Sequence, residues 1–563
     1  MDKEMERKRF ELAHYIFPDV HETVEDLEVK YPVRRIKKDA CVTRYAPSPT
    51  GFLHTGALFM ALVNKIMAKQ SEGIYFVRIE DTDQKREIEG CVKLLTEGLK
   101  EFGLTPDEGV ISENEEKGYY GPYTQSKRRD IYRICAKHLV EKGLAYPCFC
   151  TPEMLKANHD AQEKNKVVPG YYGIYAKCRN ISIDESIERV KAGEKFILRF
   201  RSQGSHLRKT SFIDGARGKI EIAENDQDVV IIKGDGLPTY HFAHVCDDHF
   251  MRTTHVVRGE EWISSVPIHL DLANAMGFEP PVYVHAPLIL VKEGESKRKL
   301  SKRKDKEADV QYFIKAGYPV EAVIEYLYTI LNSDFEMWRN KNKEASLDEF
   351  KFKLNKMSSA GSLLDMMKLN DISKELISRM SSKEVLDRVL VWSKKYDEAL
   401  YEVVSKDLDY SRKVFAVERE NVKKIRKDII KWEDIKENFY YFFNELFEEN
   451  IKESGYIYEF NEKITKDIVK KSLENYIESY NENNTKDEWF ANMKEQAEKI
   501  GFCTDMKMYK ADPDKYIGST ADFAKIIRIA ITNKENSPDI YAIMQLLGKN
   551  ETLNRFKSAK ESI

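Results

Sequence analysis

The chain has 563 residues, 91 basic and 94 acidic side chains, a formal net charge of -3 and a hydrophobic content of 42%. This length suggests three or four domains, and the hydrophobic content suffices for buried cores. The near balance of charge excludes a protein that is basic overall, so any nucleic-acid-binding surface must be local.

The N-terminal sequence MDKEMERKRFELAHYIF is charged throughout and lacks the apolar core of a secretory signal. No run approaches the roughly 20 apolar residues that span a bilayer. The eight cysteines are spread irregularly, which argues against a disulfide framework and for a reducing compartment. We therefore expect a cytoplasmic protein that binds no membrane. Residues 1–40 form a charged N-terminal extension whose role the sequence does not reveal.

A parallel βαβ unit is predicted directly after this extension. CVTRYA (41–46) predicts a short strand, TGALFMALVNKIMAKQ (55–70) a helix that is apolar on most sides, and IYFVRIED (74–81) a second strand. A strand, a turn, a helix and a strand in this order belong to a parallel sheet covered by helices. Residues 41–104 are therefore assigned to the first half of an α/β domain.

The turn of this unit, RYAPSPTGFLHTGAL (44–58), holds one histidine among residues that shape the backbone. Ligands of parallel sheets bind at the carboxyl ends of strands, beside helix N-termini whose free N–H groups attract phosphate. Gly56 has no Cβ and lets a flat base approach the backbone, and the His54 imidazole can donate to a phosphate oxygen. The turn fits a nucleotide cradle, although a structural turn with a satisfied histidine is the alternative interpretation.

The α/β pattern is interrupted and later resumes. Residues 105–235 mix short strands, such as KFILRF (195–200), with other segments, and we interpret them as an insertion. A strand in THVVRGEEW, a helix in WISSVPIHLDLANAMG and a strand in VYVHAPLIL then complete the sheet, so residues 236–305 form the second half of the domain. This half ends in the basic run KRKLSKRKDK (297–306), which suits a loop that closes over a triphosphate; a solvated basic loop is the alternative.

The composition changes after Pro319, where Lys, Glu and aromatic residues dominate. Ser346 and Glu349 form a capping box that predicts the start of a helix. Two sets of apolar residues have helical spacing: Val422, Ile425, Ile429 and Trp432, and Phe523, Ile526, Ile527 and Ile531. We therefore predict a connector over residues 306–345 and an all-α region over residues 346–563.

Four separated stretches together resemble the bacterial-type glutamyl-tRNA synthetases, which are class I aminoacyl-tRNA synthetases. They are RYAPSPTGFLHTGA, VRIEDTDQKR, GLPTYHFAHVCDDHFMRTTHVVRGEEW and KLSK. HTGA (54–57) and KLSK (299–302) resemble the two class I signatures, usually written HIGH and KMSKS. The order and spacing of all four are similar to the family's, from about residue 42 to the end of the chain.

This resemblance implies a Rossmann-type catalytic domain, an inserted acceptor-stem-binding region, a stem-contact connector and a helical anticodon-binding region. It implies that L-glutamate attacks the α-phosphate of ATP, giving glutamyl-adenylate and pyrophosphate. The glutamyl group then passes to the terminal ribose of tRNA(Glu), with Mg2+ accompanying ATP. The family also implies a monomer, and its catalysis rests on positioning and on stabilising phosphate charge.

The resemblance also implies the roles of individual residues. The ATP-binding residues are His54, Gly56, Lys299, Ser301 and Lys302, of which His54, Lys299 and Lys302 are catalytic. The glutamate-binding residues are Arg44, Ser48, Glu80, Arg86, Tyr240, His244 and Arg258. Glu80 meets the substrate ammonium, and Arg258 binds the side-chain carboxylate. Related sequences often have Asn in place of His244 and Met in place of Leu300.

Three cysteines resemble the zinc region of some members of the family. Cys148 and Cys150 are followed by Cys178, but the sequence Cys178-Arg179-Asn180 lacks the histidine that completes the usual ligand set. A closed zinc site needs four ligands. A nearby tyrosine could be the fourth, and ordinary buried cysteines are the alternative.

Three alternatives to a glutamyl-tRNA synthetase fit this sequence less well. Glutaminyl-tRNA synthetases share the signatures but carry a β-barrel-rich C-terminal part, whereas this one is predicted to be helical. A short paralogue that modifies a tRNA base lacks the long helical region. A non-catalytic tRNA-binding protein would be expected to lose His54, Gly56, Lys299 or Lys302, and all four are present. The sequence does not decide whether tRNA(Gln) is also charged.

Overall fold

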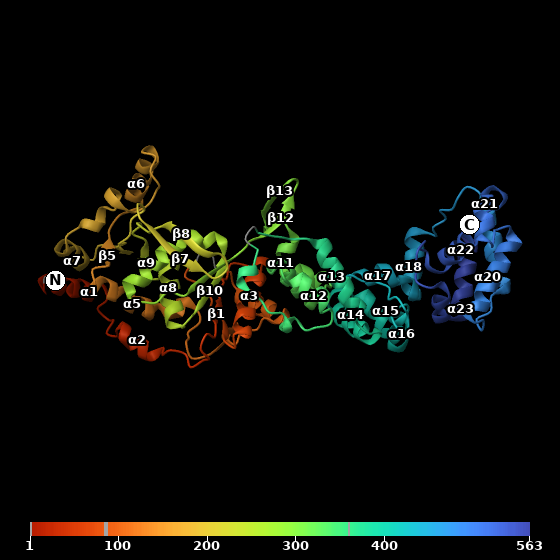
Figure 1. Ribbon diagram of the computed structural model, residues 1–563, viewed down its shortest axis with the longest axis horizontal. Helices are drawn as coiled ribbons and strands as arrows, with labels where there is room; N and C mark the ends of the chain where they lie inside the picture. The colour runs from red at the N-terminus through yellow and green to blue at the C-terminus, as the bar shows by residue number, and fades with distance from the viewer. Residues whose placement is uncertain (1–2, 84–87, 359–360) are drawn as a thin grey trace. The chain divides into compact units, whose positions relative to one another are not determined.

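A computed structural model describes residues 3–83, 88–358 and 361–563 (Figure 1). Its largest sheet has the strand order β11-β10-β1-β2-β3-β4. These strands are β1 (Val42–Tyr45), β2 (Ile74–Val77), β3 (Glu108–Ser112), β4 (Glu115–Lys117), β10 (His255–Gly259) and β11 (Val282–Ala286). All neighbouring pairs are parallel except β3 with β4. The predicted parallel sheet with two separated halves is confirmed.

The register places the two halves of the domain side by side in this sheet. Thr43 of β1 lies opposite Tyr75 of β2 on one side and His255 of β10 on the other. All four residues of β1 are buried, as expected for a central strand of a parallel sheet. Residues more than 200 positions apart in sequence therefore end at the same edge of the sheet.

Helices connect and cover these strands. The crossover helix α3 (Thr55–Gln70) is buried along most of its length, as its apolar sequence predicts. The others around the sheet are α4 (Cys91–Glu101), α5 (Arg129–Glu141), α8 (Tyr240–Phe250) and α9 (Val266–Met276), the last preceded by the 3-10 helix η5 (Glu260–Ser265). The predicted strand VYVHAPLIL is split into β11 and β12 (Ile289–Glu293), because the proline at 287 cannot donate to a ladder.

The insertion starts later than the sequence predicts. Residues 105–117 contain β3 and β4, which extend the main sheet instead of belonging to a separate region. The short sequence EGVIS has one glycine and little alternation, so it gives a weak strand signal. The elements that follow are β5 (Ala145–Cys148), α6 (Pro152–Lys164), α7 (Ile183–Lys191), β6 (Ile197–Phe200), β7 (Lys209–Asp214), β8 (Gly218–Ala223) and β9 (Val230–Ile232).

The N-terminal extension is folded onto this domain. It contains α1 (Lys3–Ile16) and α2 (Val24–Lys30). Lys8 of α1 pairs with Asp184 of α7 at 2.9 Å, and Figure 1 shows the two helices beside each other. The Tyr31 hydroxyl donates to the carbonyl of Gly121 at 3.0 Å, which ties the end of the extension to the segment after β4.

The chain divides into two compact units. The first holds residues Met1–Tyr312 and Ile324–Asp365, and the second holds Phe313–Val323 and Met366–Ile563. The helical region was predicted to start at residue 346, whereas this division falls at Met366. The elements from residue 289 to 363 are β12, β13 (Ser296–Lys299), η6 (Lys306–Ala308), α10 (Val310–Ala316), α11 (Val320–Leu331), α12 (Phe335–Lys341), η7 (Leu347–Glu349), η8 (Leu354–Lys356) and β14 (Ser362–Leu363).

The regular elements that the structure describes in the second unit are helices, joined by loops. Its helices from Met366 onward are α13 (Met366–Ser378), α14 (Ser382–Tyr396), α15 (Glu398–Lys406), α16 (Leu408–Ala416), α17 (Asp434–Phe439), η9 (Tyr440–Phe442), α18 (Asn444–Ser454), α19 (Lys466–Ser479), α20 (Lys486–Ile500), α21 (Met506–Ala511), η10 (Pro513–Lys515), α22 (Thr520–Thr532) and α23 (Ile540–Glu561). The predicted all-α character is confirmed from Met366 onward, whereas residues 346–365, which the prediction also included, contain the short strand β14.

Three local helix predictions have different outcomes. Phe523, Ile526, Ile527 and Ile531 are all buried on α22, so this periodicity is confirmed. The set beginning at Val422 is wrong, because residues 421–430 form no helix. Two residues near this segment, Glu418 and Asn421, have positive φ, which a regular helix does not tolerate. The predicted capping box at Ser346 is present, but it opens only the three-residue helix η7.

Candidate functional site

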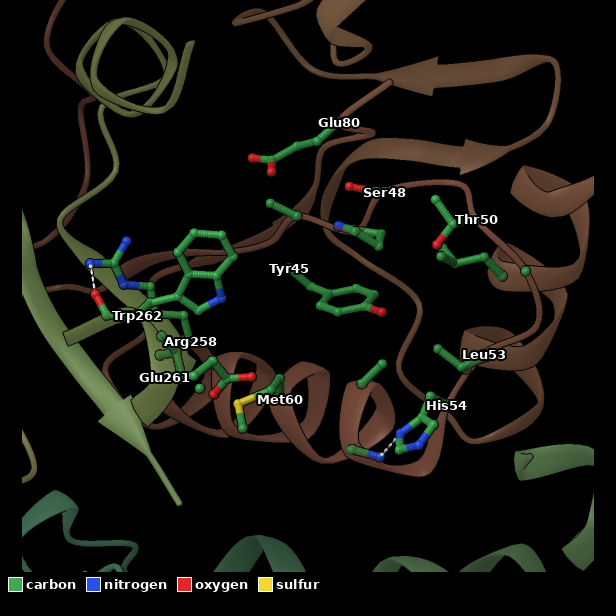
Figure 2. Close-up of a pocket in the computed structure, with 18 of the residues that line it drawn as sticks. Tyr45, Ser48, Thr50, Leu53, His54, Met60, Glu80, Arg258, Glu261 and Trp262 are labelled. Carbon is green, nitrogen blue, oxygen red and sulfur yellow. Dashed lines mark hydrogen bonds between the residues drawn. The ribbon is translucent and has the colours of Figure 1, made fainter. Parts of the chain in front are cut away.

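A cavity of about 600 Å³ opens at the carboxyl ends of β1, β2 and β10 (Figure 2). The two halves of the domain both contribute to its lining. The predicted site residues that line it are Arg44, Ser48, His54, Gly56, Glu80, Tyr240, Arg258, Lys299 and Lys302. Figure 2 shows His54 at one end of the cavity and Arg258 with Trp262 at the other. The structure thus gathers residues from four distant sequence stretches around one space.

His54 is the N-cap of α3. Its Nδ1 accepts the backbone N–H of Gly56 at 2.9 Å, as the dashed line in Figure 2 marks. A Cβ on Gly56 would lie 3.1 Å from this Nδ1, so a side chain there would crowd the cap. Burial, and then the charges of Lys302 and Lys299, lower the pKa of His54 to about 4. The imidazole is therefore neutral near pH 7, and Nε2 carries its proton.

The KLSK loop is held by its own contacts. Lys299 Nζ pairs with Glu261 at 2.9 Å, and Lys302 Nζ donates to the carbonyl of Phe52 at 3.2 Å. Burial lowers the pKa of Lys302. Ser301 is not among the lining residues, and its backbone N–H donates to Asp305 at 2.8 Å. The loop therefore brings two cations to the cavity, and their charges act on His54.

Arg44 and Glu80 are buried at the cavity wall, with 4% and 8% of their surfaces exposed. Arg44 Nε donates to Asp248 at 3.0 Å. Arg78 Nη2 donates to Glu80 at 2.8 Å, and Arg78 Nη1 donates to Asp248, also at 2.8 Å. Burial raises the pKa of Glu80, although Arg78 and Arg44 oppose this effect. One carboxylate, Asp248, therefore holds the arginine network behind both side chains.

His244 is not among the described residues that line the cavity. His244 is 1% exposed and lies behind the wall, where its Nδ1 is 2.8 Å from Asp248 and its Nε2 is 3.2 Å from the Tyr283 hydroxyl. Burial lowers the pKa of His244 to about 3. Arg86 lies outside the described residues. The structure therefore places His244 as a support of the site and leaves Arg86 a prediction.

Several residues of the site were not predicted from the sequence. Asp248 follows His244 by four positions on α8, so the two side chains lie on the same face of the helix. This spacing was the sequence signal that could have identified Asp248 as a residue of the site. Glu261 and Trp262 line the cavity and lie within the quoted GEEW stretch. Contacts such as that of Asp248 with Arg44, 204 positions away, carry no sequence signal.

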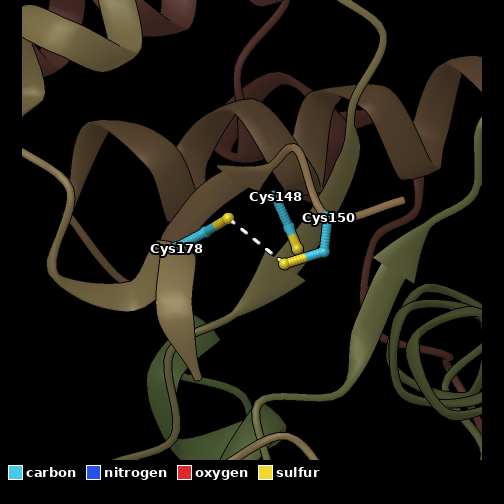
Figure 3. A group of neighbouring side chains, drawn as sticks. All are labelled: Cys148, Cys150 and Cys178. Atoms are coloured by element: carbon cyan, nitrogen blue, oxygen red, sulfur yellow. Dashed lines mark hydrogen bonds between the residues drawn. The ribbon is translucent and has the colours of Figure 1, made fainter. Parts of the chain in front are cut away.

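The three predicted cysteines come together in the inserted region (Figure 3). Their sulfur atoms lie within 4.8 Å of one another, and Cys150 Sγ is 3.6 Å from Cys178 Sγ. The Tyr171 hydroxyl lies 3.4 Å from Cys148 Sγ and 3.2 Å from Cys150 Sγ. A hydrogen bond from Cys178 lowers the pKa of the Cys148 thiol to about 4. Three sulfur atoms and one hydroxyl oxygen therefore lie close together.

Family models match two parts of the chain. Residues 40–371 match the catalytic domain of tRNA synthetases class I (E and Q), and residues 518–560 match an anticodon binding domain. Among the described residues, none of the helices combines the length and apolar character that crossing a membrane requires.

Relatives of known function match over almost the whole chain. The "Glutamate--tRNA ligase" of Clostridium perfringens is 47% identical over 97% of this chain and 98% of its own length. That of Acetivibrio thermocellus is 42% identical over the same shares. A solved glutamate tRNA ligase from Elizabethkingia meningosepticum, "in complex with its amino acid", is 26% identical with a TM-score of 0.72, covering 93% of this chain and 99% of that one. The chain therefore belongs to the glutamate–tRNA ligases, within the class I tRNA synthetases specific for glutamate and glutamine.

Proposed function

We propose that this chain activates L-glutamate with ATP, forming glutamyl-adenylate and pyrophosphate, and transfers the glutamyl group to the 3′ end of tRNA(Glu). The observation that carries this proposal is the single cavity whose ends have different chemistry. His54, Lys299 and Lys302 line one part of it, where the charges of the two lysines act on His54, and Glu80 and Arg258 line another part. A triphosphate suits the first part, and an amino acid with two carboxylates suits the second.

At the phosphate end, three groups act on ATP. The Nε2–H of His54 donates to a phosphate oxygen, because Nδ1 is already engaged by Gly56. Lys299 and Lys302 bind the triphosphate, which requires Lys299 to exchange Glu261 for phosphate oxygens. Ser301 holds the turn of the loop through its backbone. These donors stabilise the charge that develops on phosphate as pyrophosphate leaves. Mg2+ accompanies ATP and neutralises phosphate charge.

At the amino-acid end, buried charges recognise glutamate. Glu80 accepts from the substrate ammonium, and Arg258 donates to the side-chain carboxylate. Arg44 and Ser48 bind the α-carboxylate region, with Tyr240 as a wall of the pocket. Arg86 is proposed as a further contact on the resemblance alone. A neutral glutamine leaves the buried Arg258 charge unpaired, which costs binding by ~1–3 kcal/mol.

The cysteine cluster fits zinc. Sulfur ligands around a tetrahedral zinc ion lie about 3.8 Å apart, since each Zn–S bond is about 2.3 Å, and the Cys150–Cys178 separation is 3.6 Å. Cys148, Cys150, Cys178 and the Tyr171 hydroxyl would supply four donors. We propose that zinc has a structural role there, holding the inserted region that binds the acceptor stem. The helical region from residue 346 binds the anticodon loop, and the enzyme works as a monomer in the cytoplasm.

The test is tRNA charging by the purified enzyme with radiolabelled glutamate or glutamine, using tRNA(Glu) and tRNA(Gln) separately. Glutamate on tRNA(Glu) alone means a discriminating enzyme, and glutamate on both tRNAs means a non-discriminating one. Glutamine charging, or no charging of either tRNA by folded protein, contradicts the proposal. Zinc measured by atomic emission at well under one equivalent per chain contradicts the proposed metal site.

A further inference from the structure

The guanidinium of Arg258 is surrounded by hydrogen-bond acceptors from three elements. Its Nε donates to His285 Nε2 at 3.1 Å, and its Nη2 donates to the carbonyl of Trp262 at 3.2 Å. Its Nη1 lies 3.3 Å from His269 Nδ1. Arginine can only donate, so both imidazole nitrogens must present lone pairs. His285 and His269 therefore act as neutral acceptors, although each ring could exist in two tautomers.

The tautomer of His285 is set by Asp214, the last residue of β7 in the inserted region. His285 Nδ1 lies 2.6 Å from Asp214 Oδ2, and the carboxylate can only accept when ionised. The backbone N–H groups of Ala216 and Arg217 also donate to Asp214, both at 2.9 Å. His285 and Asp214 are each 1% exposed. Their contact fixes the proton on Nδ1 and leaves Nε2 free to accept from Arg258.

His241 plays the corresponding part for His269. His269 Nε2 lies 3.0 Å from His241 Nδ1. Because His269 Nδ1 accepts from Arg258, its Nε2 carries the proton and donates to His241. His269 is fully buried, and burial keeps its pKa well below the usual value. Burial likewise lowers the pKa of His241 to about 4. Both rings are neutral near pH 7.

These contacts leave a defined part of the guanidinium for a ligand. Three of its five N–H groups are held by His285, His269 and Trp262, and Nη1 and Nη2 each keep one. Burial raises the pKa of Tyr240, and the charge of Arg258 together with a hydrogen bond between the two side chains opposes this rise, so the Tyr240 hydroxyl borders the part of the guanidinium that a ligand would meet. Two N–H groups on neighbouring nitrogens suit the two oxygens of a carboxylate.

We propose that Asp214 acting through His285, and His241 acting through His269, are positioning residues that fix the Arg258 guanidinium for the side-chain carboxylate of glutamate. The proposal rests on the assignment of Arg258 to the glutamate pocket. It gives the inserted region a direct part in amino-acid specificity, because Asp214 comes from that region. The hairpin is closely packed there: a Cβ on Gly215 would lie 2.8 Å from the side chain of Val284.

The sharpest variant is Asp214→Asn, which keeps the size of the side chain. A carboxamide can donate to His285 Nδ1, which allows the tautomer with Nε2–H. That hydrogen then opposes the N–H of Arg258 Nε. We expect the KM for glutamate to rise about tenfold or more, as the loss of a buried charged hydrogen bond predicts. The KM for ATP should change less than about twofold, because the phosphate end of the cavity is untouched.

A second pair of variants separates hydrogen bonding from packing. His285→Leu removes the acceptor and should raise the KM for glutamate as strongly as Asp214→Asn. His285→Gln keeps an amide oxygen that can accept from Arg258, and should restore most of the affinity. The matched control is Asp226→Asn, which alters an exposed Asp–His pair with His206 elsewhere in the inserted region. This control should keep the wild-type KM for glutamate.

A direct reading of the tautomer does not depend on activity. NMR of the protein labelled with 15N-histidine should show His285 protonated on Nδ1 in the wild type, and a changed state in Asp214→Asn. An Nε2-protonated His285 in the wild type, or an unchanged glutamate KM in both Asp214→Asn and His285→Leu, overturns the inference. If the positioning variants leave the glutamate KM unchanged, Arg258→Leu shows which proposal has failed. An unchanged glutamate KM in Arg258→Leu means that the proposed glutamate pocket is wrong. A raised glutamate KM in Arg258→Leu means that only the positioning role is wrong.

Discussion

At the scale of single residues, one buried carboxylate organises the amino-acid end of the cavity. Asp248 is 2% exposed and accepts from Arg44 on β1 and from Arg78 directly after β2. Coulombic contacts with these arginines hold the pKa of Asp248 well below its usual value, although burial opposes the shift. Two buried cations could not stay beside the cavity without such a partner, since unpaired buried charges are strongly destabilising.

His54 carries two roles that substitution can separate. Its Nδ1 caps α3, and its Nε2–H is proposed to bind phosphate. His54→Asn keeps a good N-cap but is too short to place a donor where Nε2 lies. We expect kcat for aminoacylation to fall about 100-fold in this variant, the usual effect of losing a charge-stabilising donor, with an unchanged melting temperature.

His54→Ala is the comparison that loses both roles. It should show a similar loss of kcat and, in addition, lower the free energy of unfolding by ~1 kcal/mol through loss of the cap. Steady-state charging and urea unfolding give the two readings. Near-normal kcat in His54→Asn would contradict the proposed contact of His54 with ATP.

The sequence predicted residues of the site only where a motif named them. Arg44, Glu80 and Arg258 lie in stretches that resemble the family, and all three line the cavity. Asp214 and His285 escaped the sequence analysis, because a single Asp or His in a strand is more often structural. Their partnership depends on a contact between residues 71 positions apart, which only the fold creates.

At the scale of elements, the N-terminal extension contacts both halves of the catalytic domain. Arg34 donates to both oxygens of Glu108 on β3, each at 3.0 Å, and to the carbonyl of Met251 after α8 at 3.1 Å. Its guanidinium also lies 3.8 Å from the centroid of the Tyr120 ring. The segment therefore ties β3, the neighbour of the edge strand β4, to the second half of the domain.

Removing this contact should destabilise the first unit. Arg34 has a side chain that is 4% exposed, so Arg34→Met leaves Glu108 without its buried partner. We expect the free energy of unfolding to fall by ~3 kcal/mol. The control is Lys37→Met, since the pair of Lys37 with Glu72 is exposed on both sides, at 61% and 72%. Lys37→Met should lower the free energy of unfolding by less than ~1 kcal/mol. If urea unfolding shows equal losses for the two variants, the buried Arg34–Glu108 pair contributes no more to stability than an exposed ion pair.

Elements were predictable where local pattern and tertiary environment agree. The strand, turn and helix around residues 41–70 carry strong apolar and glycine signals, and the structure forms β1 and α3 there. The segment from Val422 to Trp432 has helical spacing but also five Lys or Arg residues between Lys423 and Lys431. Ile429 and Trp432 are buried without a helix, because packing rather than local periodicity places them.

At the scale of the whole molecule, the histidines are distributed unevenly between the two units. All 12 lie between His14 and His285 in the first unit, and the second unit contains none. Burial lowers the pKa of His54, His138, His241, His244, His249, His255, His269 and His285. The two units should therefore respond differently to mild acid.

The sign of this response follows from proton binding. A histidine whose pKa is lower in the folded state binds more protons when the chain unfolds. Its contribution to stability is present above the unfolded pKa of about 6.5 and is lost as the pH falls toward the folded value, about 4 for His54 and His241. Each such group contributes up to ~1.4 kcal/mol per pH unit in this window. Carboxyls whose pKa burial raises, such as Glu80, oppose the trend.

Lowering the pH from 7.5 to 5.5 should therefore weaken the first unit far more than the second. Hydrogen exchange followed by mass spectrometry reads each unit through its own peptides, and urea unfolding at both pH values gives each midpoint.

The variant His255→Gln removes one of the shifted histidines outside the cavity lining, so it should reduce the pH dependence of the first unit by one group's share. Equal acid shifts in the two units would mean that the buried histidines do not control stability. In the second unit, backbone hydrogen bonds lower the pKa values of carboxyls such as Glu384 and Glu488, so these groups titrate below this pH range. A larger loss of stability in the second unit than in the first would therefore contradict the argument that buried histidines cause the acid response.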